Sequence, residues 1–157
     1  MPEPKKKRFS LTNSLHNLGL LLQSDFENAH IHFILRSTPS DIYIEGDEKQ
    51  LSQVFLNLLK NSMQSLEGKT DGQIEVTLEV TNKLYIRLLD NGRGIPMKLQ
   101  EKIFVPFFTT KTEGTGIGLS LCRQIIKRHG GNFYLQESRQ GKTIFVIEWP
   151  VASFILK

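Results

Sequence analysis

Two neighbouring segments of the chain alternate between apolar and polar residues, which predicts strands with a single buried face. The sequence IEVTLEV at residues 74–80 alternates throughout, and LYIRL at residues 84–88 continues the pattern after a turn at Asn82. A sheet with one apolar face has to be covered on that face by other elements. Because helical patterns surround these strands, we expect an α+β fold, a two-layer sandwich in which helices cover one face of a mixed sheet.

The remaining elements follow from apolar spacing and from turn residues. Apolar residues at helical spacing predict a helix from residue 11 to about residue 26. The pair Asp47 and Gln50 resembles a capping box and starts a predicted helix that runs to about Leu66. Residues 31–35 and 42–44 are expected to form a hairpin around a turn at residues 37–41. Further along we expect a short helix from Pro96 to Ile103, a helix from about Gly116 to His129, and two last strands at residues 133–136 and 143–149.

The size and charge of the chain fit one domain with a basic end. The 157 residues suffice for one hydrophobic core and are too few for two sizeable ones. The net charge of +4 comes from the termini, because five of the 20 lysine and arginine residues are Lys5–Arg8 and Lys157. No aromatic or basic face accompanies the run PKKKR, which argues against a nucleic-acid-binding protein. We interpret residues 1–8 as a basic linker and residues 9–157 as the domain, as a fragment of a longer protein.

Cysteine usage and hydropathy narrow the setting. The single Cys122 excludes an internal disulfide and a cysteine-built zinc site. No apolar run is long enough to span a bilayer, and no secretory signal opens the chain. We therefore expect a cytoplasmic domain, while the sequence leaves open whether its parent protein is anchored in a membrane.

The helix predicted from Asp47 to Leu66 has an unusual polar face. Surface faces of helices usually carry Glu and Lys, and Asn is a poor helix former. A carboxamide oxygen is a neutral, hard ligand that suits Mg²⁺ already neutralised by phosphates. The pattern predicts either such a polar site or a merely solvated face. We call this face the carboxamide stripe; it consists of Gln50, Gln53, Asn57, Lys60, Asn61 and Gln64.

The sequence LLDNGRGIP places a carboxylate at the end of an apolar strand. A semi-buried Asp90 needs hydrogen-bond donors, and Gly92 and Gly94 allow a tight turn with room for a flat ligand. A carboxylate can accept from the exocyclic amine of adenine, whereas guanine would present an oxygen there. The same residues also fit an ordinary turn.

The sequence GTGIGLS at residues 114–120 stands at a boundary between a loop and a helix. Glycines at such a boundary expose backbone N–H groups, and a helix N-terminus favours anions. The spacing of Gly114, Gly116 and Gly118 differs from a GxGxxG fingerprint, and the GK[ST] of a P-loop is missing. The segment by itself is compatible with a phosphate site and equally with a plain helix start.

These segments, taken in order, resemble the motifs of the GHKL superfamily of Bergerat-fold ATP-binding domains, and within it the catalytic domain of sensor histidine kinases. QVFLNLLKNSMQSL is similar to the N box, DNGRGIP to the first glycine box and FVPFFTTK to the F box. GTGIGLSLCRQIIKRHGG is similar to the second glycine box with its following helix, and GKTIFVIEWP to the closing strand. The resemblance covers residues 47–150 and implies binding of ATP and Mg²⁺.

The resemblance also implies roles for individual residues. Asn61 matches the Mg²⁺-binding asparagine, and Asn57 matches the N-box residue that supports the phosphates. Lys111, in the segment that would form the lid over ATP, would reach the β- or γ-phosphate. We group these three residues as candidate catalytic residues.

The remaining matches concern the base and the phosphate tail. Asp90 matches the aspartate that binds adenine, and Gly92 and Gly94 match the glycines against which adenine lies. Thr143 matches a threonine that contacts adenine through water. The phosphate-facing glycines of the family correspond to Gly114, Gly116 and Gly118.

Two positions depart from the family pattern. Family members often carry a lysine and an aromatic residue shortly after the second asparagine, in contact with phosphate and base. The chain has Gln64 and Ser65 there, which shifts the expected phosphate contact to Lys111 or Lys60.

A phosphoacceptor histidine is not evident. None of His16, His30, His32 and His129 precedes the acidic residue of the acceptor box, and His129 stands before Gly130–Gly131, where a capping role is expected. The resemblance therefore implies a monomeric catalytic half that does not phosphorylate itself alone. Its partners would be the acceptor domain of a homodimeric parent and, downstream, a response regulator. The alternatives are an ATP-sensing module, or a GHKL hydrolase, which would carry a glutamate where the chain has Asn57.

Overall fold

The computed structural model of the chain describes residues 2–106, 108, 118–150 and 154–156. Its main sheet has five strands in the order β2–β4–β5–β7–β6, and only the pair β2–β4 is parallel. The strands are β2 (Ile31–Thr38), β4 (Gly72–Val80), β5 (Leu84–Asp90), β6 (Asn132–Arg139) and β7 (Lys142–Trp149). The predicted α+β fold with a mixed sheet is confirmed.

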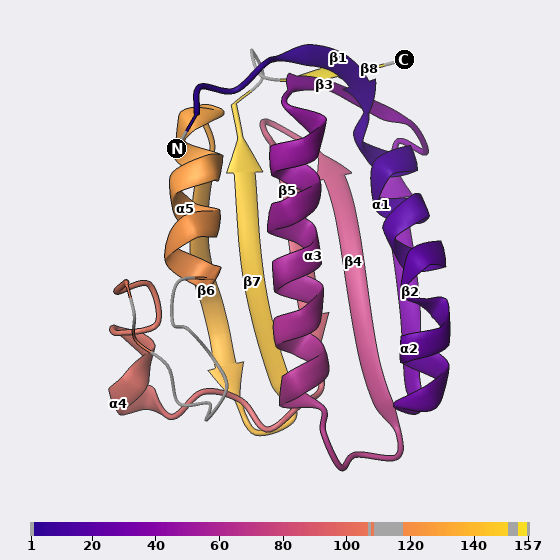
Figure 1. Cartoon of the computed structure of the whole chain (residues 1–157), viewed down its shortest axis with the longest axis vertical. Coiled ribbons are helices and arrows are strands. Elements are labelled where there is room, and N and C mark those ends of the chain that lie inside the picture. Colours follow the sequence, from indigo (N-terminus) through magenta and orange to yellow (C-terminus); the bar gives the residue numbers. More distant parts are fainter. Residues whose placement is uncertain (1, 107, 109–117, 151–153, 157) are drawn as a thin grey trace.

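Helices cover one face of this sheet, as Figure 1 shows. The layer consists of α1 (Leu11–Leu21) with the short α2 (Gln23–Asn28), α3 (Glu48–Ser65) in the centre and α5 (Gly118–Arg128). Alternate residues of the central strands, such as Val76 and Ile86, are fully buried and belong to the same hydrophobic core as Val54 and Phe55 of α3. The opposite face of the sheet carries charged residues, including the ion pair between Arg36 and Glu75. The alternation in the sequence therefore marks the buried face correctly.

A second, smaller antiparallel sheet lies at one end of the molecule, in the order β1–β3–β8. It consists of β1 (Lys7–Ser10), β3 (Ile42–Gly46) and β8 (Phe154–Leu156). Lys7 and Arg8, expected in the linker, pair with Gly46 and Glu45 of β3. The last two residues of the segment expected as a linker thus form part of a sheet edge.

The expected hairpin of residues 31–35 and 42–44 is wrong. Both segments are strands, but β2 pairs in parallel with β4, and β3 pairs with β1 and β8. Apolar alternation identifies a strand and its buried face without identifying its partner, and here both sets of partners are distant in sequence.

The helix boundaries follow local signals. The Asp47 side chain accepts a hydrogen bond from the N–H of Gln50 at 3.2 Å and caps α3, as expected. The single helix expected over residues 11–26 is divided into α1 and α2 at Leu22, and α4 (Met97–Gln100) is shorter than expected. In the part of the chain that the structure describes, no helix is long and apolar enough to cross a membrane.

Candidate nucleotide-binding site

The C-terminal end of α3, the start of α5 and α4 lie at the same end of the sheet (Figure 1). A cavity of about 870 Å³ is lined by residues of these three helices. Six of the candidate catalytic and binding residues line it together: Asn57, Asn61, Asp90, Gly94, Gly118 and Thr143. Gly92 does not line the cavity, but its N–H donates to the Asp90 carboxylate. Lys111, Gly114 and Gly116 lie outside the described residues. The fold thus gathers most of the described candidate residues at one cavity.

Asp90 is the last residue of β5 and only 3% exposed. Its Oδ1 accepts a hydrogen bond from the N–H of Gly92 at 2.9 Å and a long one from the Ser65 hydroxyl at 3.5 Å. Burial raises the pKa of Asp90, and the hydrogen bonds from Gly92, Ser62 and Ser65 partly oppose this rise. A carboxylate held in this way at a cavity wall is a strong acceptor for an amine of a ligand.

The two glycines after Asp90 are required by close backbone contacts. A Cβ on Gly92 would overlap the hydroxyl of Ser65 at the end of α3. A Cβ on Gly94, whose φ is +80°, would overlap the carbonyl of Arg139 at the end of β6. The N–H of Gly141 donates to the carbonyl of Gly92 at 2.7 Å. The turn after Asp90 is therefore held between α3 and the β6–β7 connection.

Thr143 lies directly opposite Asp90 in the ladder between β5 and β7 and is 3% exposed. Its hydroxyl is 2.8 Å from the hydroxyl of Ser138, which also accepts from the N–H of Ile95 at 2.8 Å. Gln100 of α4 donates to the carbonyls of Ile95 and Ser138 at 2.9 and 3.1 Å. These contacts link the strand that carries Thr143 to α4 on the cavity rim.

Ser138 and Gln100 are site residues that the sequence analysis missed. Ser138 belongs to β6, where an irregularity between Leu135 and Glu137 breaks the alternation of the strand. Reading outward and inward residues from the sequence fails beyond such a bulge. Gln100 belongs to no motif, and nothing in the sequence marks it as a residue of the site.

The carboxamide stripe divides into two parts. Asn57, Lys60, Asn61 and Gln64 line the cavity, at the i, i+3, i+4 and i+7 spacing of one helix face. Gln50 lies outside it and donates instead to the carbonyl of Pro2 at 3.2 Å. The stripe is therefore a polar cavity wall over its C-terminal half.

Asn57 also has a structural contact on α5. Its side chain lies close to the thiol of Cys122, which is fully buried and donates to the carbonyl of Val54 at 3.7 Å. Burial raises the pKa of Cys122 to about 12, with the Asn57 contact opposing this rise. Cys122 is thus a buried packing residue that joins α5 to α3.

The donor set fits a cation only together with ligand phosphates. Among the described residues no group of three His, Cys, Asp or Glu side chains is arranged to hold a metal ion. The hard oxygen donors that α3 brings to the cavity wall include the side-chain amides of Asn57, Asn61 and Gln64. Such a set suits Mg²⁺ that keeps phosphate oxygens and waters as its other ligands.

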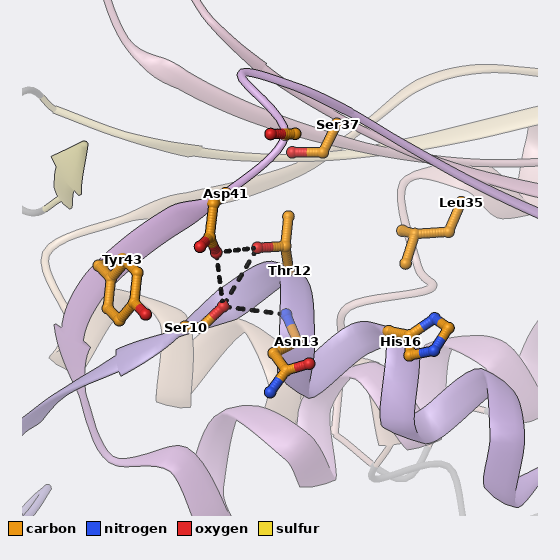
Figure 2. A pocket seen from close by; sticks show the side chains of 9 residues that line it. Ser10, Thr12, Asn13, His16, Leu35, Ser37, Asp41 and Tyr43 are labelled. Carbon is orange, nitrogen blue, oxygen red and sulfur yellow. Dashed lines mark hydrogen bonds between the residues drawn. The ribbon is translucent and has the colours of Figure 1, made fainter. Parts of the chain in front are cut away.

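A second cavity, of about 520 Å³, lies near the start of α1 and is drawn in Figure 2. Asp41 accepts hydrogen bonds there from the hydroxyls of Ser10 at 3.0 Å and Thr12 at 3.1 Å. The Thr12 hydroxyl accepts in turn from the N–H of Ile42 at 3.2 Å. These bonds join the N-terminus of α1 to the start of β3, which gives the polar residues of this cavity a structural role.

Comparison with known proteins agrees with the motif pattern. Residues 46–153 match the family described as histidine kinase-, DNA gyrase B-, and HSP90-like ATPase. Sporulation kinase A of Bacillus subtilis (strain 168) is 36% identical over 146 residues, which cover 92% of the chain and 24% of that protein. The chain thus spans about a quarter of the length of this relative.

Solved structures give the same result. The catalytic domain of histidine kinase ThkA superposes with a TM-score of 0.83 at 34% identity, covering 93% of the chain and 95% of that domain. ThkA solved in complex with the response regulator protein TrrA superposes with a TM-score of 0.77 at 31% identity, over 92% of the chain and 41% of that chain. The chain belongs to the family of histidine kinase-, DNA gyrase B- and HSP90-like ATPases, as an ATP-binding catalytic domain of the sensor histidine kinase type.

Proposed function

We propose that this domain binds Mg-ATP in the cavity between α3, α4 and α5 and donates the γ-phosphate to a histidine on a separate acceptor domain. The observation that carries the proposal is the buried Asp90 carboxylate at the cavity wall, with Gly94 and Thr143 lining the same cavity. The similarity of the chain to sensor histidine kinases supports the proposal.

The base end of the site is formed around Asp90. The adenine amine donates to the carboxylate, which also accepts from the N–H of Gly92 and from the Ser65 hydroxyl. Guanine is disfavoured because its O6 would face the carboxylate oxygen. The flat face of the base lies against the backbone at Gly94, and Thr143 contacts the base through a water molecule.

The phosphate end of the site is formed by the carboxamide stripe and the start of α5. The Asn61 amide oxygen holds the cation, and Asn57 orients the phosphates. When bound, Mg²⁺ neutralises the charge that develops on the phosphate oxygens. The backbone amides of Gly114, Gly116 and Gly118, with Lys111, hold the phosphate tail in our proposal. Phosphoryl transfer depends mainly on positioning and charge neutralisation, so a general base within this chain is not required.

The acceptor and the downstream partner lie on other domains. We propose that the acceptor histidine belongs to a dimerising helical domain of the parent protein, and that this fragment alone is monomeric and does not phosphorylate itself. The complex of ThkA with a response regulator supports a response regulator as the final phosphate acceptor. We propose that the domain acts in the cytoplasm, where ATP is available.

The proposal is tested by adding a purified acceptor-helix dimer and ATP labelled at the γ-phosphate to this chain. We expect label on the acceptor, and no label on a dimer whose acceptor histidine is replaced by glutamine. Tight ATP binding without transfer would instead favour an ATP-sensing module. This is the second candidate function, because the uncharged Gln64 and Ser65 line the cavity wall. Release of free phosphate without any acceptor would favour a hydrolase.

A further inference from the structure

The phosphate tail of ATP carries several negative charges, and the residue types at the cavity decide which side chain balances them. Gln64 lines the cavity on α3 but has no charge. The only carboxylate among the described residues of the cavity wall is Asp90, at the base end. A cationic side chain that lines the cavity and has no ion-pair partner would be able to balance the charge of the phosphates.

Three described cations line the cavity: Lys60, Arg93 and Arg139. Arg139 is already paired, since its Nε lies 3.1 Å from a carboxylate oxygen of Glu137. Arg93 belongs to the base end, because it lies between Gly92 and Gly94 and its N–H donates to the carbonyl of Ser65 at 3.3 Å. Lys60 forms no ion pair with any residue in the described ranges.

The position of Lys60 on α3 suits the phosphates. It precedes Ser65, the α3 residue that contacts Asp90, by five residues, which is about 7.5 Å along the helix axis. It lies one turn before Gln64 on the same face and next to Asn61. Its side chain is exposed, so four flexible methylenes can bring the ammonium group over the cavity mouth. The start of α5, at Gly118 and Leu119, lines the same cavity.

We propose that Lys60 binds the β- and γ-phosphates of ATP and supplies from α3 the positive charge that Gln64 lacks. This inference rests on the proposed function, because it assumes that the cavity holds ATP. It assigns to the N-box helix of this chain both the cation-binding amide of Asn61 and the phosphate-binding ammonium of the preceding residue.

The test is calorimetric titration of ATP, ADP and adenosine into the parent chain and the Lys60→Gln variant. Removing a charged hydrogen bond to phosphate should weaken ATP and ADP binding about tenfold and leave adenosine binding unchanged. Raising the ionic strength should weaken ATP binding less in the variant than in the parent, because one screened charge contact is gone. The Lys60→Arg variant should keep ATP affinity within about threefold of the parent.

Lys49→Gln is the matched control, since Lys49 is exposed on the same helix but does not line the cavity. It should bind all three compounds as the parent does, and circular dichroism should show both variants folded. Unchanged ATP affinity in Lys60→Gln overturns the inference alone, and so does an equal loss for ATP and adenosine. A parent chain that binds no ATP overturns the proposed function and this inference together.

Discussion

The N–H of Asp47 donates to Nε2 of His129 at 3.0 Å, joining two residues that are 82 positions apart. His129 is 4% exposed, and its Nδ1 lies 2.8 Å from the carbonyl of Ile125, which assigns the ring proton to Nδ1. The indole of Trp149 donates to the His129 carbonyl at 3.1 Å. His129, which follows α5, thus accepts a hydrogen bond from the backbone N–H at the N-terminus of α3. Only the neutral ring can accept this bond, because a protonated ring has no free lone pair on Nε2.

This contact predicts a loss of stability in acid. Burial lowers the pKa of His129, and nearby Lys6 adds to this effect, while the bond to Ile125 and the charge of Asp47 oppose it. The unfolded chain therefore binds a proton at a higher pH than the folded one. The stabilisation is complete above about pH 6.5 and is lost as the pH falls below it.

The measurement is urea unfolding at pH 7.5 and pH 5.0. His129→Ala should lower the free energy of unfolding at pH 7.5 by about 2–3 kcal/mol, since it leaves Asp47 without its acceptor and removes a buried ring. The fall in the free energy of unfolding between pH 7.5 and pH 5.0 should also be smaller in this variant than in the parent. His32→Ala, at an exposed histidine of β2, is the control and should keep the acid loss of the parent. An identical acid loss in His129→Ala would argue against this assignment.

Gly94→Ala should weaken both the fold and nucleotide binding. The positive φ of +80° costs about 1 kcal/mol for a residue with a Cβ, and the new methyl group would displace the carbonyl of Arg139 at the cavity. Gly68→Ala is a matched control, because Gly68 has a φ of +82° with open space around it and lies away from the cavity. Thermal unfolding should detect a loss in both variants, and ATP titration a loss only in Gly94→Ala. Equal ATP affinity in the two variants would contradict the site.

Asn61→Ala should make ATP binding insensitive to Mg²⁺. If the amide oxygen holds the cation, its removal should weaken binding of Mg-ATP about tenfold and leave binding of metal-free ATP unchanged. Gln53→Ala, on an exposed position of α3 outside the cavity, should behave as the parent does. Fluorescence titrations with Mg²⁺ and with a chelator measure both quantities. A parent that binds ATP equally with and without Mg²⁺ would exclude this role.

Much of the site could be predicted from the sequence because its residues lie in short, ordered segments. Asp90 with its glycines, and Asn57 with Asn61, each depend on one turn or one helix face, and such local patterns survive folding unchanged. The cap of α3 at Asp47 is local in the same sense. In a capping box the Gln50 side chain would accept from the N–H of Asp47, but this N–H donates instead to the distant His129.

Contacts between distant segments were beyond the sequence patterns. The partner of β2 is β4, and the expected linker residues Lys7 and Arg8 pair with β3 at a sheet edge. Ser138 reaches Thr143 only because of the irregularity in β6. The apolar pattern of a strand is compatible with several strand partners and registers, and the packing of the whole domain selects one of them.

Asp90→Asn should stabilise the ligand-free domain. The raised pKa of Asp90 means that burial disfavours its charged form, so the folded chain loses stability as the pH rises above the ordinary value of 3.8. A neutral amide of the same shape removes this cost at pH 7 and can still accept from the N–H of Gly92. Urea unfolding at pH 7 should therefore show a higher midpoint for Asp90→Asn, and a lower midpoint would contradict the argument.

The most direct test of the account is the affinity of the parent and of Asp90→Asn for ATP and GTP, measured by calorimetry at pH 7. The account predicts that the parent prefers ATP. It predicts that Asp90→Asn binds ATP weaker by about 1.5–3 kcal/mol, because an amide donor replaces the carboxylate acceptor opposite the adenine amine, and that the preference over GTP narrows. ATP affinity that is the same in the parent and in a folded Asp90→Asn variant would contradict the central claim that Asp90 binds the base.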